Sequence, residues 1–529
     1  MVSGNFEQQR MAVKQRWDVT DRLRLPEFLF APARVRILLY AEGSIRFTGG
    51  PFLGLTHVLA TLAADPWFWV RFDVVTAHRS TDPSADRQNV RLTDLNIAAD
   101  FDEIWLFGVG AGDLLTAGEK AALADFMDTH KGGVLVTGDH ASLGQGIAGA
   151  IPRAGKMRRY PAPDAVPPGW NTTLVEGSDP DTTYDFEDQS DDVPQRIRWK
   201  KYPLWSLITT PFRRRVRPHP LLCGPHGPID VLPDHQHEGE AIAPTSLSAS
   251  EWPSGPTGQV RPEVIAWGRI KDPAATHTGQ EIGVISAYDG HEASVGRVAA
   301  DATWHHFFDI NLLGLPGDPI YRGFPATPGG QAALQKIEAY FLNLAVWLAP
   351  PAKQTQMRLA ASWHVVWSDR LVELAASERL LQDSAISHLL IGEQAIDALG
   401  RVAPVCTVHQ WLYVDLLREI DPHILVRARE HLEADPVVPH LVGWFGVGAA
   451  FAGLMRRFGL PATKGELPNG PPDAGEFHKV LVESAAHGFD TALGYFGGLR
   501  DSAARIVGDE RHRAPCRTTG APDIPYQTR

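Results

Sequence analysis

Cysteine is scarce in this sequence. The 529 residues include three cysteines, Cys223, Cys406 and Cys516, which are far apart in the chain and form no CxxC motif. We therefore expect neither a disulfide framework nor a cysteine-based zinc site. So few cysteines in a chain of this length are typical of a reducing compartment, and we expect a cytoplasmic location.

The sequence also lacks an excess of positive charge and an apolar leader. Its formal net charge is -12, so nothing in the balance attracts a phosphate backbone, and nucleic acid is not expected as a partner. The first residues contain no apolar run of the kind found in secretory signals. Residues 437–455 lack Asp, Glu, Lys and Arg, but their histidine and glycines favour a buried, closely packed helix, and no membrane partner is expected.

Short apolar runs alternate with helical patterns in the first part of the chain. Residues 52–64 have helical spacing, and residues 116–131 begin with Thr116 followed by Glu119, a capping box. Strands alternating with helices predict an α/β fold with a doubly wound, mostly parallel, flavodoxin-like sheet. The runs typical of buried parallel strands are residues 34–41, 71–76, 101–107 and 133–138.

Composition divides the chain into segments. Within the α/β domain, residues 150–260 are rich in Pro, Asp, Gly and Ser, which indicates a long loop-rich insertion of the kind that often serves function. The pattern then resumes with strand candidates at 263–267, 282–287 and 297–302 and an amphipathic helix at 330–348. The expected segments are an N-terminal arm (1–33), the α/β domain (34–347), an all-helical domain (356–505) and a flexible tail (510–529).

The residues Gly138-Asp139-His140-Ala141-Ser142 directly follow an apolar strand. A strand, a sharp turn and a helix form the geometry of a nucleophile elbow, and ligands of α/β sheets bind at the carboxyl ends of strands. Asp139 and His140 are therefore candidate catalytic residues, and Ser142 is a candidate substrate contact. Glu42, in the loop after the first strand, is another candidate substrate contact. That loop lacks GxGxxG and Walker patterns, so no nucleotide cofactor is expected.

The densest group of metal-ligand side chains is the segment DHQHEGE at 234–240. Two histidines at i and i+2 face the same way on an extended chain, and imidazole with carboxylate suits zinc, iron or manganese. A solvated polar loop is the alternative interpretation. The candidate metal ligands are His235, His237, Glu238 and His140.

A second histidine-rich segment follows the strand candidate at 297–302. His305, His306 and Asp301 are candidate catalytic residues, and Trp304 is a candidate substrate contact. The flanking aromatic residues equally favour two packed, hydrogen-bonded core histidines. The sequence does not decide which histidine faces a site.

The order of these strands, together with the elbow, resembles the class I glutamine amidotransferase-like superfamily. That superfamily places Cys at the centre of a G-x-C-x-G turn, whereas His140 stands at the centre here and Ser142 replaces the second glycine. Thiol amidotransferase chemistry is therefore not implied. A histidine at this turn looks more like the ThuA-like (trehalose utilisation) branch. The resemblance covers residues 34–145 and 263–347, and it implies a catalytic histidine by position at 305 or 306.

Together these features predict a hydrolase-type enzyme. Its small polar substrate, a carbohydrate or an amide, would bind at a histidine-rich rim of the sheet, where a divalent metal would activate water; the carbohydrate rests on the resemblance alone. The alternative is a non-catalytic binding or self-assembly scaffold without the catalytic Cys, with homo-oligomer contacts in the helical domain. A closed, purely structural metal site is a third interpretation.

Overall fold

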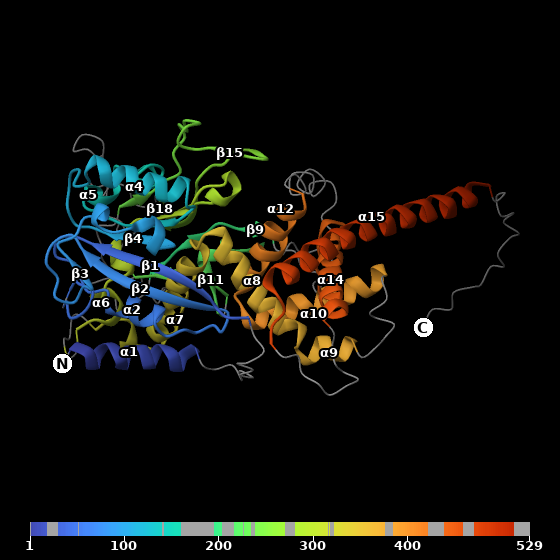
Figure 1. Ribbon diagram of the computed structural model, residues 1–529, viewed down its shortest axis with the longest axis horizontal. Coiled ribbons are helices and arrows are strands. Elements are labelled where there is room, and N and C mark those ends of the chain that lie inside the picture. Colours follow the sequence, from blue (N-terminus) through green and yellow to red (C-terminus); the bar gives the residue numbers. More distant parts are fainter. Residues whose placement is uncertain are drawn as a thin grey trace, which may run out of the picture.

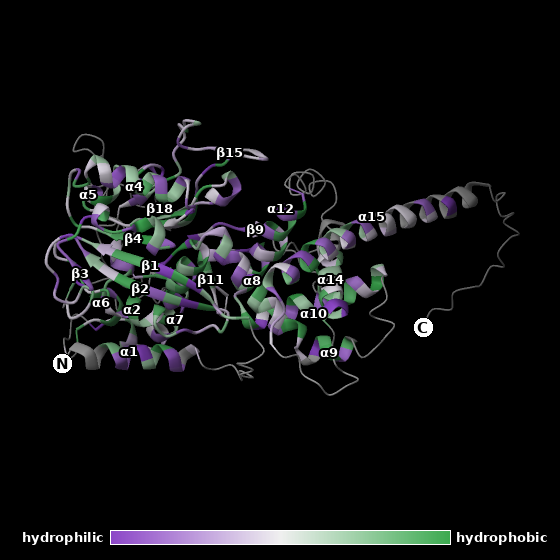
Figure 2. Ribbon diagram, in the orientation of Figure 1, coloured by the Kyte–Doolittle hydropathy of each residue, from purple (hydrophilic) through white to green (hydrophobic). Residues whose placement is uncertain are grey.

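The computed structural model places an α/β part beside a helical part that begins at residue 351 (Figure 1). Hydrophobic residues lie in the strands of the sheet and in the helices that face it (Figure 2). The structure describes residues 2–17, 30–50, 52–139, 142–159, 195–203, 216–225, 227–233, 239–269, 281–315, 317, 322–375, 384–421, 438–458 and 470–512.

A nine-stranded mixed sheet organises the α/β part. Its strands are β1 (Ala33–Ala41), β2 (Val70–His78), β3 (Arg87–Gln88), β4 (Glu103–Phe107), β5 (Gly133–Val136), β8 (Arg198–Trp199), β17 (Glu263–Arg269), β18 (Glu281–Tyr288) and β19 (Val298–Asp301). They lie in the order β3-β2-β1-β4-β5-β19-β18-β17-β8. Neighbours from β3 to β19 are parallel, whereas β18, β17 and β8 each run antiparallel to the strand before. The predicted α/β character is confirmed, and the antiparallel edge was not predicted.

Both faces of the sheet are covered by helices. Along β1, Ile37 and Leu39 belong to one buried cluster, and Leu38 and Tyr40 belong to another. Because side chains alternate across a strand, each face has its own core. One face carries α2 (Thr56–Leu62), α6 (Asp309–Leu313) and α7 (Pro328–Trp347), and the other carries α3 (Ile97–Asp100), α4 (Ala117–Asp128) and α5 (Gln145–Ala148).

The predicted insertion contains short strands that pair with one another. Within it, β14 pairs antiparallel with β6, and β8 joins the edge of the main sheet through β17. The short strands are β6 (Arg158–Arg159), β7 (Gln195–Arg196), β9 (Tyr202–Pro203), β10 (Val216–Arg217), β11 (Cys223–Gly224), β12 (Gly227–Pro228), β13 (Val231–Leu232), β14 (Glu240–Ala241), β15 (Ser254–Gly255) and β16 (Gly258–Gln259).

The N-terminal arm contains a helix, α1 (Val2–Trp17), that the sequence did not predict. Its last residue donates the indole N–H of Trp17 to Glu338 Oε2 at 3.1 Å. Glu338 is fully buried on α7, where its other oxygen lies 3.2 Å from His57 Nε2. A buried carboxylate therefore connects α1 to the core of the α/β part.

The helical part is built around α14. This helix packs between α10 and α15, where an added Cβ at Gly448 would lie 1.6 Å from the His388 carbonyl oxygen. Such close packing fits the buried helix expected at 437–455, and none of the helices in the ranges given above has the length and apolar character that a membrane crossing requires. The helices are α8 (Pro351–Val366), α9 (Asp369–Ala375), α10 (Ala385–Val402), α11 (Val405–Gln410), α12 (Leu416–Ile420), α14 (Val438–Phe458) and α15 (Ala474–His512), with a π-helical turn at Trp411–Asp415.

The C-terminal helix extends well beyond the rest of the helical part (Figure 1). It continues to His512, so it includes the first residues of the segment 510–529 that the sequence marks as a flexible tail. Residues 513–529 of that predicted tail lie outside the described residues.

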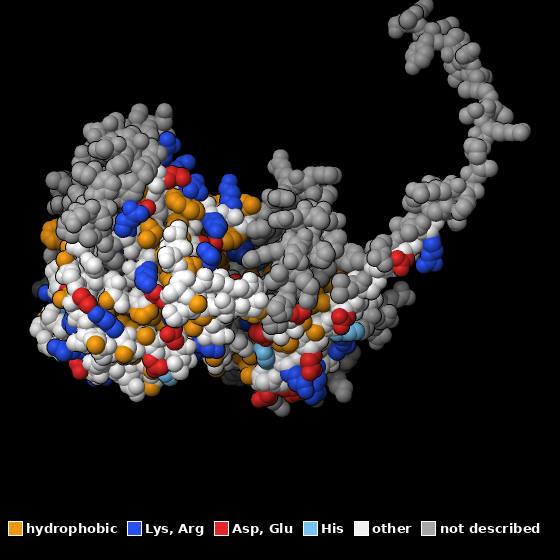
Figure 3. All heavy atoms as spheres, turned by 90° about the horizontal axis from the view of Figure 1, so that it is seen from above, with side chains coloured by type: hydrophobic (Ala, Val, Ile, Leu, Met, Phe, Trp, Pro, Cys, Tyr) orange, Lys and Arg blue, Asp and Glu red, His pale blue; other side chains and the backbone are white. Residues whose placement is uncertain are grey.

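Charged side chains of both signs are interspersed on the face drawn in Figure 3. Representative exposed pairs are Arg34 with Asp73 at 2.7 Å and Arg198 with Glu281 at 2.7 Å. Such pairs contribute little to stability, because water screens the charges. Buried polar groups lack that screening, so their removal changes stability more.

Because Glu103 is fully buried at the start of β4, we expect the stability of the fold to depend on pH. Burial raises the pKa of its carboxyl group well above the usual value, the Trp105 indole N–H, 3.0 Å away, partly opposes this, and Asp102 adds to it. The folded protein therefore binds a proton that the unfolded chain releases above about pH 4.3, and this contribution to stability is lost as pH rises toward the folded pKa.

We expect Glu103→Gln, which needs no proton, to gain stability relative to the wild type by about 1–3 kcal/mol between about pH 5 and about pH 8. Thermal denaturation midpoints at both pH values measure this change. Glu483→Gln, on an exposed side chain, is the control and should show no such trend. A constant difference between Glu103→Gln and wild type at both pH values would show that Glu103 does not bind the proton.

Candidate functional site

The candidate site lies at the carboxyl ends of the adjacent parallel strands β5 and β19. The chain leaves β5 through Gly138 and Asp139, and it leaves β19 into a 3-10 turn at Trp304–His306. The two exits are hydrogen-bonded, because the Trp304 N–H donates to the Gly138 carbonyl at 2.8 Å. The rim predicted from the strand order therefore brings Asp139 and the histidine segment together.

His305 lies between an amide and a carboxylate. Its Nδ1 is 2.8 Å from Asn311 Oδ1 on α6, and its Nε2 is 3.5 Å from Asp139 Oδ2. His305 is 8% exposed and Asp139 is 2% exposed. Because an amide oxygen can only accept, Nδ1 carries the proton in this arrangement, and Nε2 is the nitrogen directed at the carboxylate.

Thr303 fixes the position of both members of this pair. Its hydroxyl accepts the His305 N–H at 3.1 Å, which caps the 3-10 turn, and donates to Asp139 Oδ1 at 3.4 Å. A threonine that precedes a short helical turn is a recognisable cap in a sequence. The orientation of the histidine ring is therefore set by local chain geometry as well as by Asn311.

His306 belongs to a separate network in the core. Its Nδ1 is 2.7 Å from Asp301 Oδ1, and the Tyr340 hydroxyl donates to Asp301 Oδ2 at 2.7 Å. Burial and the neighbouring Asp301 raise the pKa of Tyr340 well above its usual value, so it stays a donor. His306, Asp301 and Tyr340 are fully or almost fully buried, which fits the packed-core interpretation for His306; the catalytic roles predicted for His306 and Asp301 stay predictions.

Arg158 connects the segments of the rim. Its guanidinium donates to the Ala302 carbonyl through Nε at 3.1 Å and through Nη2 at 2.5 Å, and Nη2 also donates to the Asp139 carbonyl. Gly239 donates its N–H to the same Ala302 carbonyl at 3.2 Å. An added Cβ at Gly239 would lie 1.9 Å from Arg158 Nη2, so only glycine fits there. The chain of the insertion thus returns to the rim directly after residue 238.

The three predicted substrate contacts lie near this rim and differ in their burial and in their neighbours. Glu42 is buried and accepts the Gly110 N–H at 2.5 Å, so it joins two loops that follow neighbouring strands. Ser142 is half-buried. Trp304 is buried, with its ring 5.8 Å from that of His305. These three roles stay predictions.

The predicted metal ligands His140, His235, His237 and Glu238 lie outside the described residues. Among the residues that are described, no three His, Cys, Asp or Glu side chains form a group that could hold a metal ion. The metal prediction therefore stays a prediction.

Sequence reasoning named Asp139 and Asp301, the carboxylates beside the two histidines, but missed the residues that hold these pairs in place. Asn311 and Tyr340 approach from α6 and α7, and Arg158 approaches from the insertion. Only Thr303 had a local signal, as the cap before Trp304–His306. The others depend on tertiary packing, for which one sequence has no local pattern.

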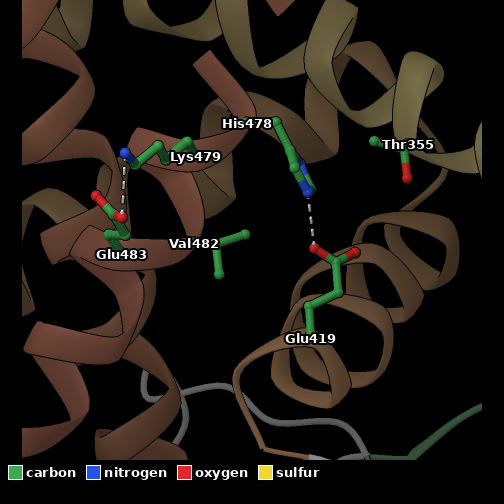
Figure 4. A pocket seen from close by; sticks show the side chains of 6 residues that line it. All are labelled: Thr355, Glu419, His478, Lys479, Val482 and Glu483. Carbon is green, nitrogen blue, oxygen red and sulfur yellow. Dashed lines mark ion pairs between the residues drawn. The ribbon is translucent and has the colours of Figure 1, made fainter. Parts of the chain in front are cut away.

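A pocket of about 500 Å³ lies in the helical part, away from this rim (Figure 4). His478 Nε2 is 3.2 Å from Glu419 Oε2, and Lys479 Nζ is 3.8 Å from Glu483 Oε1. The charged side chains that line the pocket are therefore paired with one another. Thr355, Glu419, His478, Lys479, Val482 and Glu483 line it.

Comparisons with known proteins give no relative. No family model matches the chain, and no curated protein and no solved structure matches it. The resemblance to amidotransferase-like proteins therefore stays a prediction. The geometry of the rim is the structural observation that bears on function.

Proposed function

We propose that this protein is a hydrolase-type enzyme acting on a small polar substrate, with His305 and Asp139 as its acid–base pair. The observation that carries the proposal is the 3.5 Å approach of His305 Nε2 to Asp139 Oδ2 at the carboxyl ends of β5 and β19. In α/β sheets this edge is where ligands bind. A histidine held by one partner and directed at a carboxylate is the arrangement used to move protons.

In this proposal Nε2 of His305 takes the proton of an attacking water or hydroxyl group. Asn311 keeps the proton on Nδ1, so Nε2 offers its lone pair. Asp139 then stabilises the positive charge that the ring acquires, as a carboxylate beside an imidazolium does. The same ring returns the proton to the leaving group.

We also propose that the α/β part is a doubly wound domain of the amidotransferase-like kind, nearest the ThuA-like branch. The parallel order from β2 to β19 supports this, as does the elbow position of Asp139 directly after β5. A carbohydrate or an amide as the substrate class depends on this resemblance, because fold alone does not fix function.

A panel of p-nitrophenyl glycosides, esters and amides tests the proposal on wild type, His305→Gln and Asp139→Asn. We expect wild type to hydrolyse members of one class, and both variants to have a kcat lower by about 10²–10⁴-fold, the usual contribution of an acid–base group.

His130→Gln is the matched control, because His130 is exposed after α4 and should keep the wild-type rate. If His305→Gln hydrolyses the best substrate as fast as wild type, the assignment of His305 is wrong. Circular dichroism spectra of all variants separate lost chemistry from lost folding.

The second candidate function is a non-catalytic scaffold with self-assembly through the helical part. The fully buried His306–Asp301–Tyr340 network favours it, because these groups are satisfied within the core. A panel that wild type leaves unhydrolysed, together with a stable oligomer in light scattering, would favour this function over the enzyme.

A further inference from the structure

Cys223 and Cys406, 183 positions apart, lie side by side where the α/β part meets the helical part. The Cys406 N–H donates to Cys223 Sγ at 3.4 Å, and the Cys406 thiol also hydrogen-bonds to Cys223. Both residues are buried, and both are free thiols. The two sulfur atoms are therefore neighbours without being bonded.

Rigid elements on both sides hold this pair. Asn343 on α7, itself buried, donates to the Cys223 carbonyl at 2.9 Å and to the Leu221 carbonyl at 3.2 Å. Cys406 is the second residue of α11, and Pro404 directly precedes this helix. A disulfide needs a defined separation of its two chains, and anchored backbones keep the separation of this pair constant.

The surroundings make the two thiols chemically different. The hydrogen bond from Cys406 lowers the pKa of Cys223; burial opposes this, and the N–H groups of Cys406 and Val405 and the charge of Arg217 lower the pKa further. The same hydrogen bond, together with burial, raises the pKa of Cys406. Cys223 is therefore the more acidic thiol of the pair, and the one that more readily becomes the nucleophilic thiolate.

Arg217 has an unused donor beside the pair. Its Nε is buried and has no hydrogen-bond partner within the described part of the chain. A buried cation with a free donor stabilises an anion nearby. This arrangement favours the thiolate of Cys223 over its neutral thiol.

Exposed residues adjoin Cys406 and Arg217 in the chain. Val405 precedes Cys406 and is 46% exposed, and Val216 precedes Arg217 and is 43% exposed. Small local openings at these positions would admit hydrogen peroxide, whereas a larger reagent would need a larger opening.

We propose that Cys223 and Cys406 form an oxidation site at which hydrogen peroxide produces a disulfide between the α/β part and the helical part. The Cys223 thiolate attacks one peroxide oxygen, the O–O bond breaks, and the released hydroxide leaves as water after protonation, so that Cys223 becomes a sulfenic acid. The Cys406 sulfur, on losing its proton, attacks this sulfur, and a second water leaves. The two thiols lose two electrons to one peroxide, which balances the step.

Peptide mass mapping after hydrogen peroxide treatment and alkylation tests the proposal on the full-length protein. We expect a cross-linked peptide pair containing Cys223 and Cys406, lighter by two hydrogens than the separate peptides and separated again by dithiothreitol. Cys516→Ser, which removes the third cysteine, should give the same cross-link.

Single variants identify the attacking sulfur. With dimedone added in the denaturing quench, where access to the sulfur no longer limits the reaction, Cys406→Ser should carry the sulfenic acid adduct on Cys223, whereas Cys223→Ser should carry none on Cys406. Arg217→Gln should slow cross-linking of the wild-type pair several-fold. The proposal is overturned if wild type, folded by circular dichroism, leaves both thiols alkylated at a peroxide dose that oxidises Cys516, or if the adduct forms on Cys406.

Discussion

Replacing Arg297 with methionine is expected to cost about 2–4 kcal/mol of folding free energy, somewhat less than removing one partner from a fully buried ion pair, because the Asp289 side chain is 23% exposed. Arg297 is fully buried at the start of β19. Its Nε donates to Asp289 Oδ1 at 2.8 Å and its Nη1 donates to the Trp347 carbonyl at 2.9 Å. The guanidinium also lies 4.9 Å from the Trp347 ring.

The size of this effect depends on the Asp289 carboxylate, which stays in place when Arg297 is removed. Asp289 is held in its charged form: burial alone would raise its pKa, but Arg297 and then Arg418 lower it below the usual value. Arg418, which belongs to the helical part, is farther away, with Nη1 3.7 Å from Asp289 Oδ2. Without Arg297 the carboxylate loses its nearest cation, and the junction between the two parts weakens.

Urea denaturation of Arg297→Met, followed by circular dichroism and tryptophan fluorescence, measures the loss. Adding Asp289→Leu to this variant should recover more than half of it, because no buried charge then lacks a partner. Arg34→Met is the matched control; its pair with Asp73 is exposed to solvent, so its removal should change stability far less. Equal losses in Arg297→Met and Arg34→Met would contradict the role given to burial.

Much of the sheet could be predicted because buried strands have local patterns. The runs at 34–41 and 101–107 correspond to β1 and β4, and the capping box of α4 has the expected bonds from Glu119 N to Thr116 Oγ1 and from Thr116 N to Glu119 Oε2. The strand candidates at 263–267 and 282–287 were also found, as β17 and β18.

The length of the connection between β18 and β19 indicated that these two strands pair antiparallel, which strand patterns alone do not show. Residues 289–297, the connection from β18 to β19, are too few for the crossover that a parallel pair needs. Connection length, and not apolar periodicity, was therefore the informative feature. Helix α1 was not predicted, because its polar sequence shows no clear apolar stripe.

The sequence predicted which segments lie close together at the rim, but not which side chains pair there. Strand order alone places Asp139 beside the segment at 301–309. It could not tell His305, which faces Asp139, from His306, which faces Asp301, because the two rings diverge only through Asn311 and Tyr340. Adjacent histidines in a 3-10 turn point in different directions, and the packing partners decide which one faces the rim.

Arg158→Met should destabilise the protein by about 2–4 kcal/mol, because it removes buried hydrogen bonds to two carbonyl groups. The Ala302 carbonyl would lose both guanidinium bonds and keep the one from the Gly239 N–H, and the Asp139 carbonyl would lose the bond from Nη2. Since these carbonyls lie where the chain leaves β19 and β5, the approach of Asp139 to His305 should loosen as well. Arg158→Lys should show a smaller loss, because one ammonium group cannot reach as many acceptors as the planar guanidinium.

The neighbouring residue supplies the control for this experiment. Arg159 has a half-exposed side chain that pairs with Glu240 at 3.1 Å, so Arg159→Met should change stability by less than about 1 kcal/mol. Denaturation midpoints of the three variants and of wild type give the comparison. If Arg158→Met and Arg159→Met unfold at the same midpoint, the buried guanidinium does not stabilise the rim; if Arg158→Met alone is destabilised, the rim depends on an arginine that belongs to neither β5 nor β19.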